Sequence, residues 1–146
     1  MSDANRERNA QSRQRLRELI ARLDDEALQR QTDAEWTIGA ILAHMAFWDE
    51  SCVVRWQQFD RTGDFPSLSL DIVDLMNEAN LPTWRALPGP IVRDLVMRAA
   101  EAADARTENL SPEALAFVTD HDRTFILERW EHREEHLDEI ERFLAG

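Results

Sequence analysis

Two histidines near the C-terminal end of the chain have the spacing of a metal-binding pair. His132 and His136 lie four residues apart in a segment of helical periodicity, so both rings project from one helical face. Phe125, Ile140 and Phe143 recur on the same face at helical steps. The charged residues among them are expected on the solvated side: Arg133, Glu134, Glu135 and Glu139. The pair can offer two ring nitrogens to one cation, but the short motif also fits two half-exposed histidines on an ordinary amphipathic helix.

A third histidine lies within another apolar stripe. His44 shares a helical face with Ile38, Ile41, Leu42, Met45 and Trp48. A neutral imidazole on a buried face needs partners for both nitrogens, which a backbone acceptor or a metal ion can provide. Three inward-facing histidines on two helices, in a chain with four histidines, favour a shared site. We therefore predict that His44, His132 and His136 bind one divalent metal ion, zinc or nickel. His121 lies off any apolar stripe and is expected in a solvated loop.

Three further residues are candidates for a substrate pocket beside these histidines. Trp48 and Cys52 follow His44 by four and eight residues, and Glu128 precedes His132 by four. Glu128 could also accept a hydrogen bond from an imidazole N–H. Each residue has a plainer interpretation: Trp48 as core filler, Cys52 as a small buried hydrophobic residue and Glu128 as a solvated charge. The sequence does not identify a catalytic acid or base.

The residues that position these side chains follow a helical pattern throughout the chain. Four principal amphipathic helices are predicted at about 5–30, 37–60, 91–108 and from 124 to the C-terminal end, with an N-cap at Thr37. An accessory segment over 71–87 is broken or kinked near Leu81 by Pro82, and a short turn covers 112–116. No segment alternates like a half-buried strand. The pattern indicates an all-α four-helix bundle, which builds metal sites from facing helices.

Composition limits both the fold and the function. A length of 146 residues favours one domain over residues 1–146. The net charge is −12 and all 17 basic residues are arginine, which argues against nucleic-acid binding and excludes a Schiff-base lysine. The single Cys52 excludes an intrachain disulfide and fits a reducing cytoplasm. No signal peptide is recognisable, and no apolar run approaches the roughly 20 residues that cross a membrane.

The segments Trp36–Asp49 and Glu131–Ile140, together with the pair Asn77-Glu78, resemble the DinB/YfiT-like superfamily. The resemblance covers nearly the whole chain, and its most specific feature is the histidine triad, which falls on His44, His132 and His136. It implies an up-down-down-up four-helix bundle, frequently a homodimer, with a zinc or nickel ion on the three histidines. An excess of apolar and aromatic side chains, such as Trp56, Phe59 and Trp84, also favours a homodimer. Characterised relatives include thiol S-transferases that use bacillithiol or mycothiol, a mycothiol-dependent maleylpyruvate isomerase, and hydrolases that disarm a DNA-damaging metabolite.

Three functions are compatible with this reading of the sequence. The first is a metal-dependent enzyme that transfers a low-molecular-weight thiol to small electrophiles or otherwise detoxifies them. The second is a metal-dependent hydrolase that uses metal-bound hydroxide. The third is a non-enzymatic binding module in which the ion ties two helices together. An open coordination position beside a lined cavity would favour the enzymes, whereas a closed four-ligand site would favour the module.

Overall fold

The chain folds into an all-helical bundle, as the periodicity predicts. The structure is a computed structural model that describes residues 1–146. Its long helices are α1 (Asp3–Ala21), α3 (Ile38–Thr62), α4 (Leu70–Ala86), α5 (Gly89–Glu108) and α7 (Arg129–Ala145). The shorter elements are α2 (Asp25–Leu28), α6 (Pro112–Asp120) and the 3₁₀ turn η1 (Thr124–Leu127). There is no β-strand, and Gln31 and Thr37 form one isolated bridge.

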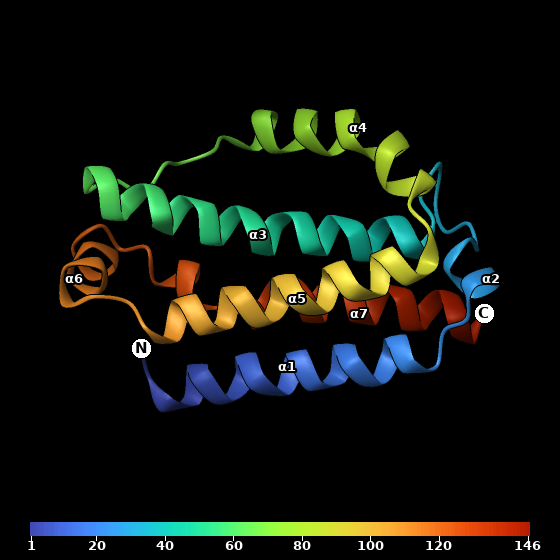
Figure 1. The fold of residues 1–146 in the computed structure, drawn as a ribbon, viewed down its shortest axis with the longest axis horizontal. Helices are drawn as coiled ribbons and strands as arrows, with labels where there is room; N and C mark the ends of the chain where they lie inside the picture. Colours follow the sequence, from blue (N-terminus) through green and yellow to red (C-terminus); the bar gives the residue numbers. More distant parts are fainter.

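Four of the long helices form the bundle and α4 lies outside it. In Figure 1, α1 and α7 run in one direction while α3 and α5 run in the opposite one, which is the predicted up-down-down-up order. Around the bundle, α3 packs against α5 and α7, and α1 packs against the other sides of α5 and α7. The helix α4 crosses over the outer side of α3 and connects it to the parallel α5 (Figure 1).

The bundle encloses a core of 16 buried apolar residues drawn from α1, α2, α3, α5 and α7. A smaller cluster at the far end of α3 includes Trp56, Phe59 and Phe65. Trp84, on α4, packs against the bundle through Ala40 and Ala43 of α3. Trp56, Phe59 and Trp84 are therefore buried, and they do not form the aromatic surface that the sequence suggested for a dimer interface.

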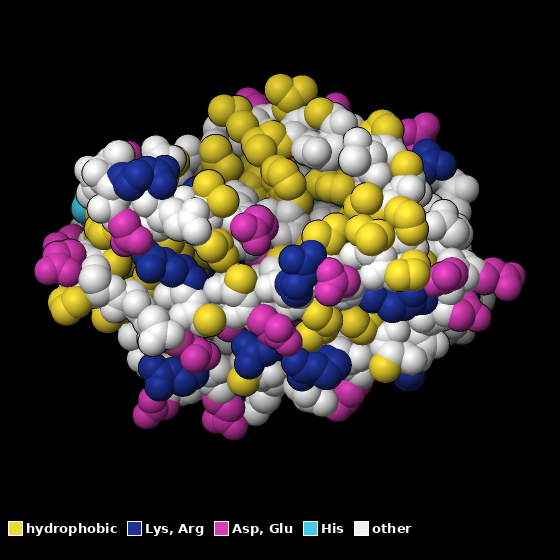
Figure 2. All heavy atoms as spheres, viewed as in Figure 1, with side chains coloured by type: hydrophobic (Ala, Val, Ile, Leu, Met, Phe, Trp, Pro, Cys, Tyr) yellow, Lys and Arg dark blue, Asp and Glu magenta, His cyan; other side chains and the backbone are white.

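The exposed apolar residues lie elsewhere. Leu70, Ile72 and Leu75 of α4 are 80%, 47% and 63% exposed. Figure 2 shows hydrophobic side chains gathered over α4 and over the boundary between α4 and α5, while arginines and carboxylates intermingle over α5 and α1. None of the helices combines the length and the apolarity needed to span a bilayer.

Capping residues determine where several helices begin or end. The Thr37 hydroxyl accepts a hydrogen bond from the Ala40 N–H and caps α3 as predicted. Gly63 ends α3 in the left-handed region at a φ of 75°. The accessory segment is one helix, α4, rather than two short ones, and Pro82 lies inside it.

Other helix boundaries differ from the sequence prediction. The first helix ends at Ala21 rather than near residue 30, because Asp24 caps the separate short helix α2. The helix α6 continues to Asp120, beyond the predicted turn. The last helix begins at Arg129, because residues 124–127 form a 3₁₀ turn and Glu128 has non-helical dihedral angles.

Candidate metal centre

Three histidine side chains from two helices converge between α3 and α7. The Nε2 atom of His44 lies 3.1 Å from the Nε2 atom of His136 and 3.2 Å from that of His132. One ligand atom from each histidine lies within 4.8 Å of the other two, so the three form a group that could hold a metal ion. The four-residue spacing on α7 and the inward face of α3 bring the rings together.

Asn77 of α4 fixes the tautomer of His44. The indole N–H of Trp48 donates to Asn77 Oδ1 at 2.9 Å, and an indole nitrogen can only donate. The contacted amide atom is therefore the oxygen, and His44 Nδ1, 3.2 Å from the same oxygen, must carry the proton. This leaves the lone pair of His44 on Nε2, the atom that faces the other two histidines.

His136 is oriented in the same way by a carboxylate. Its Nδ1 lies 2.9 Å from Glu139 Oε2, and an ionised carboxylate only accepts, so Nδ1–H donates and Nε2 is free to bind a cation. Such imidazole–carboxylate pairs are common around metal ions. His132 differs, because its Nδ1 is buried without a hydrogen-bond partner in the chain.

Burial keeps the imidazoles of His44 and His132 neutral. Desolvation, followed by the proximity of His136, lowers the pKa of His44 from 6.5 to about 4. Desolvation also lowers the pKa of His132 to about 2, with further contributions from His136 and Arg129. At neutral pH both rings are therefore uncharged, which is the form that coordinates a metal ion.

The arrangement fits a divalent ion on chemical grounds. The tautomers set by Asn77 and Glu139 turn the Nε2 lone pairs of His44 and His136 towards each other at 3.1 Å, and a cation between the two nitrogens removes their repulsion. Two nitrogens that share a tetrahedral zinc ion at about 2.0–2.1 Å are about 3.3–3.4 Å apart. Imidazole nitrogen suits zinc, nickel and related borderline ions, and no thiolate or carboxylate joins the group.

Two cavities adjoin the triad. One of about 540 Å³ is lined by His44, His132 and His136, and also by Trp48 and Cys52. A smaller one of about 260 Å³ has His44, His136, Asn77 and Glu139 among its lining residues. The larger cavity is bounded by α3, α4, α7 and the turns before α4 and α7.

Arg133 is buried, which contradicts the prediction that it faces solvent. It is 0% exposed and donates to both oxygens of Asp104, at 2.7 and 3.0 Å, and to Asp49 at 3.1 Å. Burial disfavours its charge, but Asp49 and Asp104 outweigh that effect and raise the pKa of Arg133. Arg133 lies between His132 and His136 in sequence and connects α7 to α3 and α5, so it helps to fix the rotation of the helix that carries both histidines.

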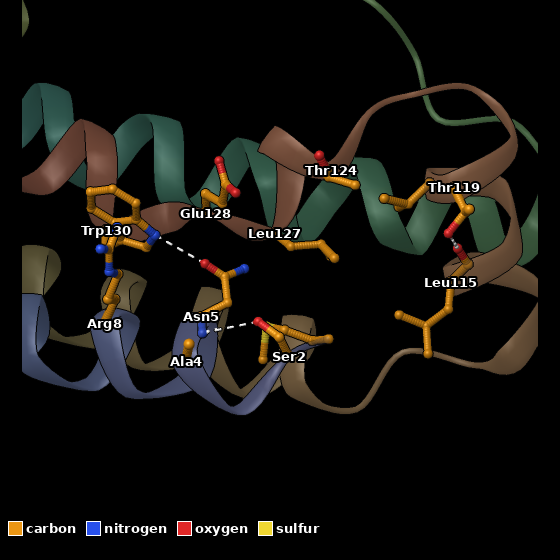
Figure 3. Close-up of a pocket in the computed structure, with 12 residues that line it drawn as sticks. Ser2, Ala4, Asn5, Arg8, Leu115, Thr119, Thr124, Leu127, Glu128 and Trp130 are labelled. Atoms are coloured by element: carbon orange, nitrogen blue, oxygen red, sulfur yellow. Dashed lines mark hydrogen bonds between the residues drawn. The ribbon is translucent and has the colours of Figure 1, made fainter.

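Phe125 and Glu128 also depart from their expected positions, for a single reason. The expected positions of both residues assume a helix that starts near Thr124, whereas α7 begins at Arg129. Phe125 is 59% exposed at the mouth of the larger cavity. Glu128 lies outside that cavity and lines another one with Asn5 and Trp130 (Figure 3). It is not a hydrogen-bond partner of any histidine, and His121 is exposed at the end of α6 as expected.

The helix start at Arg129 depends on a residue of α1. The Asn9 side chain donates to Leu127 O at 3.0 Å and accepts from the Trp130 N–H at 2.9 Å. It thereby satisfies backbone groups at the beginning of α7 that a continuous helix would have paired internally. Asn9 lies more than 100 residues before Leu127 and Trp130 in the sequence, so local periodicity does not predict these hydrogen bonds.

Comparison with known sequences agrees with this architecture. The sequence profile of the DinB superfamily matches residues 8–140, nearly the whole chain. The chain belongs to the DinB superfamily. No curated protein and no solved structure matches the chain significantly.

The match to the DinB superfamily agrees with the helical bundle, and together with the three-histidine cluster it fits a metal-dependent protein. The residues that orient the histidines in this DinB protein were harder to find in the sequence. Asn77 is indicated only by the family resemblance, and helical periodicity places Glu139 on the solvated face. The three-residue spacing from His136 to Glu139 is the signal that could have identified the second of these.

Proposed function

We propose that this DinB-superfamily protein is a metal-dependent enzyme that transfers a low-molecular-weight thiol to small electrophiles. His44, His132 and His136 would hold one divalent ion, zinc or nickel. The observation that carries the proposal is the convergence of three Nε2 atoms at the wall of a cavity of about 540 Å³, which has room for a small molecule.

A bound divalent ion supplies Lewis acidity that stabilises a thiolate at neutral pH. In the transfer, the sulfur of the thiol forms a bond to the electrophilic carbon, the leaving group departs with its bonding electrons, and the thiol proton passes to solvent. Trp48 and Val73 supply apolar walls for the substrate. Asn77 and Glu139 hold the histidine rings in place.

The reacting sulfur is proposed to come from a co-substrate rather than from Cys52. Burial raises the pKa of the Cys52 thiol, with Asp49 adding to the effect and the arginines Arg129 and Arg55 opposing it. Cys52 is therefore protonated and unreactive at neutral pH. We assign no side chain as a general base.

The cavity argues against a purely structural site but does not separate thiol transfer from hydrolysis. A purely structural site is normally closed by four protein ligands, whereas this group has three and faces open space. Hydrolysis requires the same three histidines, so only an assay of products separates it from thiol transfer.

The test is metal analysis of the purified protein combined with a screen of thiols against electrophiles. We expect about one zinc or nickel ion per chain and formation of thioether products. His44→Ala should abolish transfer, while Cys52→Ala and His121→Ala should retain it. Cleavage of the electrophile by water without thioether would support the hydrolase, and the absence of both products with a bound metal would support the module.

We further propose that the protein forms a homodimer in a reducing, cytoplasmic environment. The exposed apolar residues of α4, including Leu70 and Leu75, support an association surface. One free cysteine and no disulfide is compatible with a compartment that maintains thiol co-substrates in reduced form.

A further inference from the structure

The cavity beside the histidines contains a cationic side chain that the metal site does not use. Two arginines, Arg55 and Arg129, and one glutamate, Glu135, are its charged lining residues. The formal charges of these three lining residues sum to +1, whereas the whole chain carries −12. The molecule as a whole repels anions at long range, so an anionic ligand would need a local cation to bind here.

The two arginines differ in how their charge is balanced. Arg129 donates from Nε to Asp49 Oδ1 at 2.9 Å, so a buried carboxylate neutralises it. Arg55 forms no ion pair, and its hydrogen bonds go to the carbonyl oxygen of Pro66, at 2.9 Å from Nε. Its guanidinium lies 4.3 Å from the centre of the Phe65 ring. Burial, together with nearby Arg123 and Arg129, lowers the pKa of Arg55, and its Nη1 atom makes no hydrogen bond within the chain.

Helical spacing places Arg55 on the same face of α3 as the metal site. His44, Trp48, Cys52 and Arg55 follow one another at steps of four, four and three, and all four line the cavity. His44 and Arg55 are separated by about 16 Å along the helix axis. Helical side chains lean towards the N-terminal end, so His44 and Arg55 lean in the same direction, and the separation between the imidazole and the guanidinium stays on the order of 10–15 Å.

We propose that this cavity binds an extended organic anion, with its carboxylate on Arg55 and its reactive end at the three histidines. The inference rests on the proposed function, because it takes this cavity to be the substrate site. A guanidinium forms charge-assisted hydrogen bonds with a carboxylate. Phe65, Val73 and Ile126 line the cavity as well and supply contact for an apolar middle section. Arg55 is thus a specificity-determining residue that selects an anionic substrate.

A matched pair of probes tests the proposal without requiring activity. The probes are 4-phenylbutanoate and its neutral analogue 4-phenylbutanamide, titrated into metal-free protein and followed by calorimetry. We expect the carboxylate to bind at least tenfold more tightly than the amide. Arg55→Gln should reduce that preference to within about twofold, while the affinity for the amide stays unchanged and so reports an intact cavity.

Arg61→Gln serves as the control, since Arg61 is an exposed arginine of the same helix that does not line the cavity. It should keep the full preference. Equal affinities of the parent protein for both probes would overturn the proposal, as would a preference that persists in Arg55→Gln. Arg55→Lys should restore part of the preference, which a merely structural role for Arg55 in holding Pro66 would not produce.

Transfer assays identify which substrate carries the carboxylate. One arm combines 4-(bromomethyl)benzoate with the neutral thiol 2-mercaptoethanol, and the other combines 4-(bromomethyl)benzamide with 3-mercaptopropanoate. The arm whose kcat/KM falls at least tenfold in Arg55→Gln contains the carboxylate that Arg55 recognises. If kcat/KM is the same for the parent and Arg55→Gln in both arms, the proposal is contradicted. If the protein shows no transfer activity but the probe preference is present, the proposed function fails while the anion site stands.

Discussion

At the scale of single residues, the site depends on which nitrogen of each imidazole carries its proton. Trp48 orients the Asn77 amide, and Asn77 in turn leaves the lone pair of His44 facing the other two rings. Glu139 does the same for His136. These side chains act before any ion binds, because they prepare the nitrogens that coordinate it.

Asn77→Ala is therefore expected to weaken zinc binding about 10- to 100-fold, the usual effect of losing a partner of a metal ligand. Titration calorimetry of the metal-free protein measures this directly. Asn80→Ala is the matched control, since Asn80 lies on the same helix and donates only to the backbone oxygen of Met76. Equal zinc affinities for the parent and Asn77→Ala would show that His44 needs no such partner.

The lowered pKa values of His44 and His132 predict a pH-dependent stability in the metal-free protein. In the unfolded chain both histidines titrate near 6.5, whereas folding lowers their pKa values to about 4 and about 2. The unfolded chain therefore binds more protons below pH 6.5, and the free energy of unfolding falls as the pH drops from 6.5 towards 4. Each histidine contributes at most about 1.4 kcal/mol per pH unit.

Urea unfolding at pH 7, 6 and 5 in the presence of a chelator checks this pH dependence. Carboxylates also titrate over part of the range, so the double variant His44→Phe/His132→Phe isolates the histidine contribution. Its free energy of unfolding should depend less steeply on pH than that of the parent. Parallel profiles for the two proteins would mean that the histidines are not held neutral by folding.

At the scale of helices, the placement of α7 depends on polar contacts that cross the bundle. Arg133 reaches Asp49 of α3 and Asp104 of α5, and Asn9 of α1 satisfies backbone groups at the beginning of α7. The helices themselves were predictable, because their apolar residues repeat at helical spacing. The beginning of α7 and the burial of Arg133 were not, because their partners lie 29 to 121 residues away in sequence.

Arg133→Met should lower the free energy of unfolding by about 3–5 kcal/mol, because it leaves buried carboxylates without their shared cation. Denaturant titration gives the value, with Arg142→Met as the control on the same helix. Arg142 is exposed, so its replacement should change stability by no more than about 0.5 kcal/mol. A loss below 1 kcal/mol for Arg133→Met would mean that Arg129 and Arg13 suffice to neutralise Asp49 and Asp104.

At the scale of the molecule, the crossover helix α4 connects two parallel helices and forms one wall of the larger cavity. It buries only Trp84 fully and presents Leu70, Ile72 and Leu75 to solvent. The sequence suggested an association surface but assigned it to Trp56, Phe59 and Trp84, which the bundle buries. Periodicity shows that a side chain lies on an apolar face but not which apolar faces remain uncovered.

We predict that the protein is a homodimer and that Leu75→Glu shifts it towards a monomer, because a charge on the exposed face of α4 disfavours burial there. Light scattering at micromolar concentration measures the mass of both proteins. Leu115→Glu, a half-buried leucine of α6 remote from this face, is the control that should remain dimeric. A monomeric mass for the parent protein would contradict the prediction.

The histidine triad is the part of the site that the sequence predicted most fully, because its spacing on two apolar faces is a local signal. The structure brings the three Nε2 atoms together. We predict that these three atoms bind a single divalent ion.

Zinc titration calorimetry of the parent protein, His44→Ala and His121→Ala measures this binding. The parent and His121→Ala should each bind one zinc ion per chain with the same affinity, since His121 is exposed at the end of α6. His44→Ala should bind zinc more weakly by orders of magnitude, because it removes one of three ligands. If His44→Ala binds zinc as tightly as the parent, the three histidines do not form a metal site.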